Sequence, residues 1–120
     1  TEDPSNDFTP DYGTITTYRS ASGMGIRLDA GSIYQSYKVS PFFDSMLVKV
    51  SAQGRTLDGA VRKMSRALKE FRIRGVKTNI HFLQNVILHD DFRNGKASVN
   101  FIKNNPSLFK IKIPQDRTTK

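Results

Sequence analysis

The sequence predicts an α+β domain with a mainly antiparallel sheet and two or three helices. Short segments rich in β-branched and aromatic residues come first along the chain, and two segments with helical periodicity follow them. The connections are too short for the crossover helices that repeated parallel strands require. A chain of 120 residues with 37% hydrophobic and 25% charged residues suits one globular domain with a modest core.

The first half of the chain contains the expected strands. Residues 1–13 hold four acids, two prolines and a glycine, and therefore predict a loop that ends in a turn. Residues 14–19 predict a strand, and a small-residue turn then leads to a second strand at 26–29. The clearest strand covers about 44–52, with Met46, Val48 and Val50 expected on one face and Leu47, Lys49 and Ser51 on the other.

The strongest helix prediction covers residues 57–72. Apolar residues recur there at helical spacing, and Met64 and Leu68, four residues apart, are expected in the core. Thr56 is the expected N-cap, and Gly75 is the expected C-cap. A second helix is predicted near 80–88, capped by Thr78 or Asn79. Beyond it, the pattern predicts a strand at 97–102 and an extended segment at 109–113.

The composition limits the possible functions. The net charge of +8 and a pI near 10 leave open a small basic nucleic-acid-binding domain, although no aromatic strand motif of the RNA-binding type accompanies the charge. The absence of cysteine excludes disulfides and thiolate metal sites. No apolar run approaches the roughly 20 residues of a membrane span, and residues 1–4 lack the features of a signal peptide. We therefore expect no membrane partner.

Few residues suggest catalytic or metal chemistry. His81 and His89 are eight residues apart, which does not match the usual spacing of metal ligands, so no metal site is predicted. Gly23 and Gly25 lack the third glycine of a phosphate-binding loop and indicate a turn instead. Arg27 is the most informative charge. In a strand it shares a face with Asp29, so it can form an ion pair there or bind a carboxylate or phosphate of a partner.

An ordered set of short motifs resembles the C-terminal domain of biotin carboxylases along nearly the whole chain. The motifs are Asp3-Pro4, Phe8-x-Pro10-x-x-Gly13, Gly23-x-Gly25-Ile26-Arg27, Asp44-Ser45-Met46, Lys49, Gly75-Val76-Lys77-Thr78-Asn79, Phe92-x-x-Gly95 and Phe101-Ile102. Residues 18–21, 70–75, 106–109 and 116–120 are similar to the pyruvate carboxylase branch in particular. Departures occur at Gln35-Ser36 and Lys38. The resemblance divides the chain into a domain at 1–113 and a linker at 114–120 towards the rest of an enzyme.

The resemblance implies a ligase activity. Bicarbonate is activated with ATP and Mg²⁺, biotin is carboxylated, and pyruvate is then carboxylated to oxaloacetate, which serves gluconeogenesis and anaplerosis. The implied partners are an upstream ATP-grasp region and the biotin carrier and carboxyltransferase domains of the same polypeptide. The implied assembly is a homo-oligomer, specifically a homotetramer. The implied location is cytoplasmic, or the mitochondrial matrix in a eukaryote.

The resemblance also assigns a few residues. The family's catalytic arginine precedes the Glu2-Asp3-Pro4 motif and so lies outside this chain. We therefore assign no catalytic residue and expect the chain alone to be inactive and to bind no cofactor. Met24 and Arg27 match positions of the biotin carboxylase dimer contact, and Asp44 matches an acid near that interface. Val99 matches a position whose apolar side chain closes over the adenine of ATP.

Overall fold

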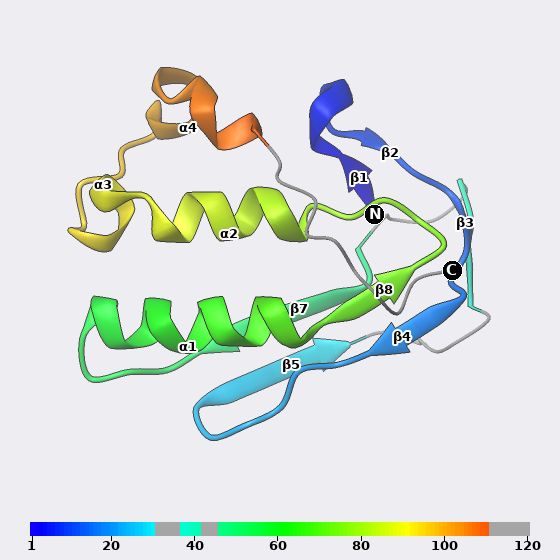
Figure 1. Cartoon of the computed structure of the whole chain (residues 1–120), viewed down its shortest axis with the longest axis horizontal. Helices are drawn as coiled ribbons and strands as arrows, with labels where there is room; N and C mark the ends of the chain where they lie inside the picture. Colours follow the sequence, from blue (N-terminus) through cyan, green and yellow to red (C-terminus); the bar gives the residue numbers. More distant parts are fainter. Residues whose placement is uncertain (31–36, 42–45, 111–120) are drawn as a thin grey trace.

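The computed structural model describes residues 1–30, 37–41 and 46–110. Two helices lie side by side over paired strands, and the remaining short helices follow the second of them (Figure 1). The strands are β1 (Glu2–Asp3), β2 (Thr9–Pro10), β3 (Gly13–Thr14), β4 (Thr17–Arg19), β5 (Ile26–Ala30), β6 (Lys38–Val39), β7 (Val48–Ala52) and β8 (Arg72–Arg74). The α-helices are α1 (Leu57–Glu70), α2 (Ile80–Leu88), α3 (Asp90–Arg93) and α4 (Phe101–Asn104), and 3₁₀ turns form at Pro4–Asn6 and Pro106–Phe109.

The strands form four antiparallel pairs, which confirms the predicted α+β class. The longest pair joins β5 to β7 and places Leu28 opposite Val50 and Asp29 opposite Lys49. The pair of β4 and β8 joins segments on either side of α1. Strands this short depend on packing for their stability, because isolated two-stranded sheets are marginal in water. No helix among the described residues is long and apolar enough to cross a membrane.

Helix α1 begins as predicted but ends earlier. The side chain of Thr56 accepts a hydrogen bond from the backbone nitrogen of Gly59 at 3.0 Å, so Thr56 is the N-cap. The helix stops at Glu70, and the prediction of Gly75 as its C-cap is wrong. The backbone of β8 pairs with β4 instead of continuing the helix, so tertiary pairing determines the boundary.

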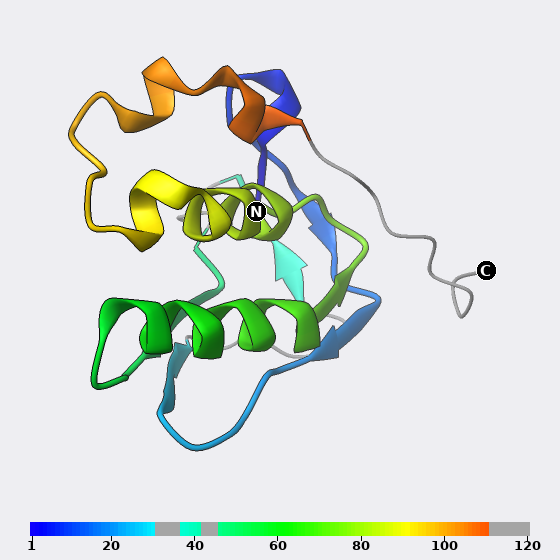
Figure 2. The same cartoon turned by 60° about the vertical axis from the view of Figure 1, so that its left-hand side comes forward.

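The core lies between α1 and the strands. The apolar residues of β5 and β7 pack against Ala67 and Phe71, which are 2% and 5% exposed. A second cluster gathers around Ile15, which is fully buried. The third cluster joins α2 to the chain ends. There Phe82 contacts Phe8 with ring centroids 4.9 Å apart, and the N-terminal segment lies beside the 3₁₀ turn at Pro106–Phe109 (Figures 1 and 2).

Several sequence-based expectations are corrected. Residues 1–13 form a short β1–β2 hairpin around a 3₁₀ turn, not only a loop. The strand expected at 97–102 is wrong, because α4 forms there and buries Phe101 against Phe82 and Leu108. The extended segment expected from Phe109 is also wrong at that residue, which belongs to a 3₁₀ turn. Its continuation at 111–113 lies outside the described residues.

The strand expected at 44–52 begins later, at Val48. Val48 and Val50 do lie on the partly buried face, and Lys49 is exposed as expected. The alternation fails at the start of the segment, since Met46 is 65% exposed and Leu47 is buried. Leu47 precedes the paired strand and packs into the cluster around Ile15. Side-chain alternation holds only where the backbone is in the strand.

Leu68→Ala is expected to destabilise the chain far more than Met64→Ala. Leu68 is 5% exposed, so its truncation should cost about 2–5 kcal/mol. Met64 is only half-buried, which corrects its assignment to the core, and its truncation should cost about 1 kcal/mol. Urea unfolding followed by circular dichroism measures both. Equal costs would contradict the observed orientation of α1.

Candidate functional site

The outward face of β5 carries the charged residues that the sequence singled out. Ile26 and Leu28 turn towards the core, and Arg27 and Asp29 therefore point away from it. The guanidinium of Arg27 donates to the carboxylate of Asp29 from Nε and Nη2, at 3.3 Å each. The two side chains are 79% and 49% exposed, so solvent screens the ion pair. The expected pairing of these residues is therefore observed in the isolated chain.

Met24 lies in the turn that leads into β5. Its side chain is 89% exposed, which is unusual for a large apolar residue. Gly25 makes the turn possible, because its φ of +79° lies in the left-handed region. Met24 and Arg27 are thus both solvent-exposed at one end of the β5–β7 sheet. Asp44, the third residue predicted near this surface, lies outside the described residues.

Val99 lies in the turn before α4 and is fully exposed, with a relative exposure of 101%. It belongs to none of the apolar clusters of the described residues. An apolar side chain in this position is available for contact with a group outside the chain.

A network around Lys77 ties the N-terminal hairpin to the loop before α2. Lys77 Nζ donates to Asp3 Oδ2 at 3.0 Å, and its backbone nitrogen donates to Asp11 Oδ2 at 2.6 Å. Asp3 also accepts hydrogen bonds from the backbone nitrogen and hydroxyl of Ser5. Although both Asp3 and Lys77 belong to noted motifs, sequence reasoning missed their contact. The two residues are 74 positions apart, and no local pattern indicates such a contact.

The network shifts the pKa values of both Asp3 and Lys77. Hydrogen bonds from Ser5 and Lys77 hold the pKa of Asp3 below its usual 3.8, and the contact with Asp3 raises the pKa of Lys77 above 10.5. Asp3 therefore stabilises the fold above about pH 3.8, and this contribution is lost as the pH falls through its lowered pKa. The contribution of Lys77 is present below 10.5 and is lost as the pH rises through its raised pKa. Across neutral pH the network holds the hairpin in place.

A groove of about 250 Å³ opens beside this network. Its lining is mainly apolar and comes from β7, the end of α1 and the start of α2, with Thr1 and Glu2 at its rim. Thr78 and Asn79 add polar groups. Its lining contains no histidine, cysteine or lysine, and Glu2 is its one carboxylate. Apolar side chains form most of the surface of this groove.

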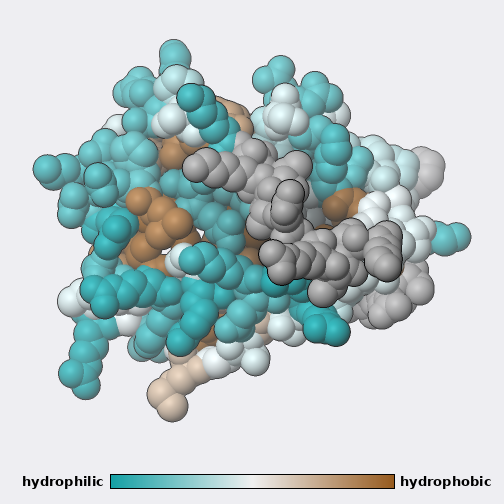
Figure 3. Space-filling view, in the orientation of Figure 1, coloured by the Kyte–Doolittle hydropathy of each residue, from teal (hydrophilic) through white to brown (hydrophobic). Residues whose placement is uncertain are grey.

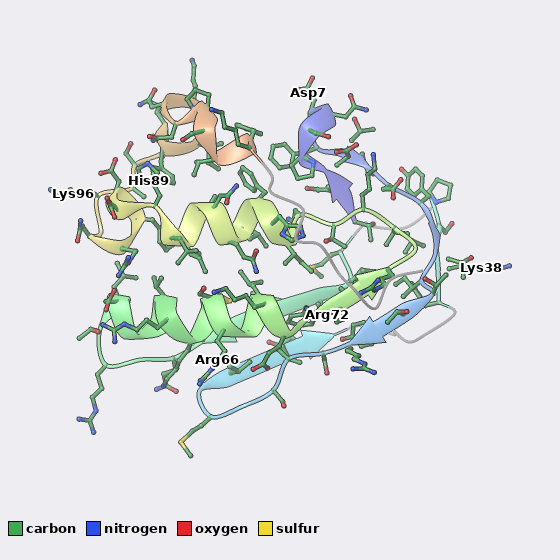
Figure 4. All side chains as sticks on the ribbon, viewed as in Figure 1. Asp7, Lys38, Arg66, Arg72, His89 and Lys96 are labelled. Atoms are coloured by element: carbon green, nitrogen blue, oxygen red, sulfur yellow. The ribbon has the colours of Figure 1, made fainter. Side chains whose placement is uncertain are left out.

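The two histidines lie at the start of α3 and on α2. His89 lies at the start of α3, where its Nδ1 accepts a hydrogen bond from the backbone nitrogen of Asp91 at 3.1 Å (Figure 4). Its ring meets Phe101 edge-on at 5.0 Å. His81 lies on α2 and is half-buried. The part of the chain that the structure describes contains no group of three or more potential metal ligands.

Known proteins are similar to this chain in both sequence and fold. The family model of the biotin carboxylase C-terminal domain matches residues 1–104. Human mitochondrial pyruvate carboxylase is 52% identical over 120 residues, which is 100% of this chain and 10% of that protein. The crystal structure of a complete multifunctional pyruvate carboxylase from Rhizobium etli matches with a TM-score of 0.93 and 49% identity. The match covers 98% of this chain and 11% of that one.

A third relative is the biotin carboxylase domain dimer of the Hydrogenobacter thermophilus 2-oxoglutarate carboxylase, in complex with MgADP, ADP and bicarbonate. It matches with a TM-score of 0.89 and 35% identity, covering 93% of this chain and 24% of that one. The chain spans about a tenth of the length of the curated relatives it matches. These relatives are carboxylases, and they do not support the alternative of a nucleic-acid-binding domain. The matched residues and the shared fold show that this chain belongs to the biotin carboxylase C-terminal domain family.

Proposed function

We propose that this chain acts as the C-terminal domain of the biotin carboxylase part of a pyruvate carboxylase. The observation that carries the proposal is the identity of 50% and 52% to bacterial and human pyruvate carboxylases along the whole chain. In this proposal residues 1–113 are the domain and residues 114–120 lead towards the rest of the polypeptide. The location would be cytoplasmic, or the mitochondrial matrix if the organism is a eukaryote.

The proposed enzyme is a ligase that uses ATP to activate bicarbonate as carboxyphosphate. Biotin, when attached to its carrier domain, supplies the ureido nitrogen that accepts the carboxyl group and delivers it to pyruvate, which becomes oxaloacetate. An ATP-grasp region, a carrier domain and a carboxyltransferase domain would belong to the same polypeptide. The matched pyruvate carboxylases, of which this chain spans about a tenth, support such a multidomain arrangement.

In this proposal the chain positions other parts of the enzyme and supplies no group that reacts with the substrates. The Lys77 network fixes the N-terminal hairpin against the loop before α2. Val99 would close over the adenine of ATP, which its apolar and fully exposed side chain suits. The described residues contain no cluster of three or more histidine, cysteine or acidic side chains, and we assign no step with Mg²⁺ to them.

The outward face of β5 would meet a second biotin carboxylase domain. Met24 offers an exposed apolar contact and Arg27 an exposed cation, the combination found in interface anchors. The related domain from Hydrogenobacter thermophilus is described as a dimer, which supports this assignment. Asp44 is proposed to lie near the same interface.

The activity of the longer polypeptide tests the proposal. The polypeptide that contains this chain is expected to cleave ATP in a bicarbonate-dependent reaction and to form oxaloacetate from pyruvate. The 120-residue chain alone is expected to cleave no ATP above a buffer blank, because it is proposed to carry no catalytic residue. Carboxylation of 2-oxoglutarate in place of pyruvate would overturn the substrate assignment. ATP cleavage by the chain alone would overturn its supporting role.

A further inference from the structure

A second groove, of about 300 Å³, lies between α1 and the end of α2 and is strongly basic. Four cations line it: Arg62, Arg66, Lys69 and Arg93. The first three lie four and then three residues apart on α1, so they share one face of the helix. Arg93 approaches from α3.

The charges of this groove are not balanced within the described residues. Asp58 pairs with Arg62 at 2.6 Å and with Arg93 at 3.1 Å. The side chains of Arg66 and Lys69 have no acidic partner in the part of the chain that the structure describes. Four cations and one carboxylate leave three unbalanced positive charges. Like charges this close repel one another, so binding of an anion would relieve the repulsion.

The floor of the groove adds two independent features. Ser65 lines the groove, and its hydroxyl forms no hydrogen bond with any described residue. None of the described side chains has a buried polar atom without a partner, so this unpaired hydroxyl is open to the groove, where it can donate to a ligand. Val61 and Leu88 make the rest of the floor apolar, and Leu88 is 46% exposed. Figure 3 shows a hydrophobic area between α1 and α2 that is bordered by hydrophilic side chains.

We propose that this groove binds an organic phosphate. Arg66 and Lys69 hold the phosphate group, and the hydroxyl of Ser65 donates to one of its oxygens. The apolar part of the ligand covers Leu88 and Val61. A phosphate matches the free cations because its oxygens accept several charge-assisted hydrogen bonds at once. The apolar floor favours an organic phosphate over the inorganic ion. The site is separate from the outward face of β5, which points away from α1.

Three simple probes test the site in the ¹⁵N-labelled 120-residue chain: phenyl phosphate, inorganic phosphate and phenol. Nuclear magnetic resonance titrations should show phenyl phosphate binding most tightly and phenol not at all. The shifted amides should concentrate at residues 62–69 and around Leu88. Binding should weaken as salt rises, because salt screens exposed charges. Phenol binding as tightly as phenyl phosphate, or shifts spread evenly over the surface, would overturn the proposal.

Matched variants separate this site from general attraction to a basic chain. Arg66→Gln with Lys69→Gln should weaken both phosphates about tenfold or more, because each loses charge-assisted hydrogen bonds. Leu88→Ser should weaken phenyl phosphate and leave inorganic phosphate unchanged. Arg27→Gln with Lys49→Gln removes the same charge from the β5–β7 sheet and should change neither affinity. Equal loss in this control would overturn the proposal. Thermal melting checks that each variant is folded.

Discussion

Gly75→Ala is expected to prevent stable folding of the chain. Gly75 has a φ of +100°, a conformation that residues with a Cβ rarely adopt. A Cβ at this position would overlap the carbonyl oxygen of Thr14 and lie 2.9 Å from the backbone nitrogen of Thr16. That nitrogen donates to the carbonyl of Arg74 at 2.8 Å, so the clash falls on the backbone that joins the β4–β8 pair. Backbone cannot move aside as a flexible side chain does.

The expected loss exceeds about 4 kcal/mol, because strain and overlap act together. Gly23→Ala is the matched control. Gly23 also has a positive φ, of +140°, but nothing lies within 4 Å of a Cβ built on it. It should therefore cost only the strain of the backbone, about 1–3 kcal/mol. Urea unfolding of the two variants measures the difference, and equal losses would show that the contact with Thr14 does not matter.

Arg27→Glu in the full-length enzyme is expected to weaken association of the biotin carboxylase domains while leaving the fold intact. The change replaces an exposed cation with an anion beside Asp29, so attraction on the outward face of β5 becomes repulsion. In a two-fold interface the same change occurs twice, because both copies present the same surface. Sedimentation velocity across a range of protein concentrations measures the shift towards smaller species.

Two further variants sharpen this result. Arg55→Glu makes the same change of charge at an exposed position before α1 and should leave the assembly unchanged. Asp29→Ala removes the ion-pair partner but keeps Arg27, so a strong loss there would assign the effect to the pair and not to Arg27 alone. An unchanged assembly state of Arg27→Glu at low concentration would leave Arg27 as a surface residue paired with Asp29.

Local patterns in the sequence correctly predicted the helices and strands that depend on residues close together in the chain. The apolar spacing and the cap at Thr56 located the start of α1, and the pattern at 80–88 located α2. The alternation around Arg27 predicted which side chains of β5 face the core. The same patterns failed at residues 97–102, where apolar residues suit a strand or a helix equally and the contact of Phe101 with Phe82 decides in favour of α4.

Some residues of the candidate sites could also be predicted from the sequence, and others became visible only in the structure. Arg27 could be named from the sequence because it follows a glycine turn on a short strand whose repeat determines where it points. Met24 was named because the family resemblance assigns its position to the dimer contact. The ion pair of Lys77 with Asp3 could not be predicted, since no local rule links residues so far apart in the chain. The basic groove was also missed. Its cations from α1 were visible in the sequence, but Arg93 joins them only because α3 folds back beside α1.

By itself, the sequence determined the class of the fold, its two main helices and the inward and outward faces of β5. These follow from the periods of helix and strand, which act over a few residues. Only the tertiary structure decided that residues 72–74 pair with residues 17–19, that Gly75 meets the backbone of Thr14, and that a free serine hydroxyl lies among four cations. Each of these depends on where distant segments pack, and that placement is set by the burial of the whole core.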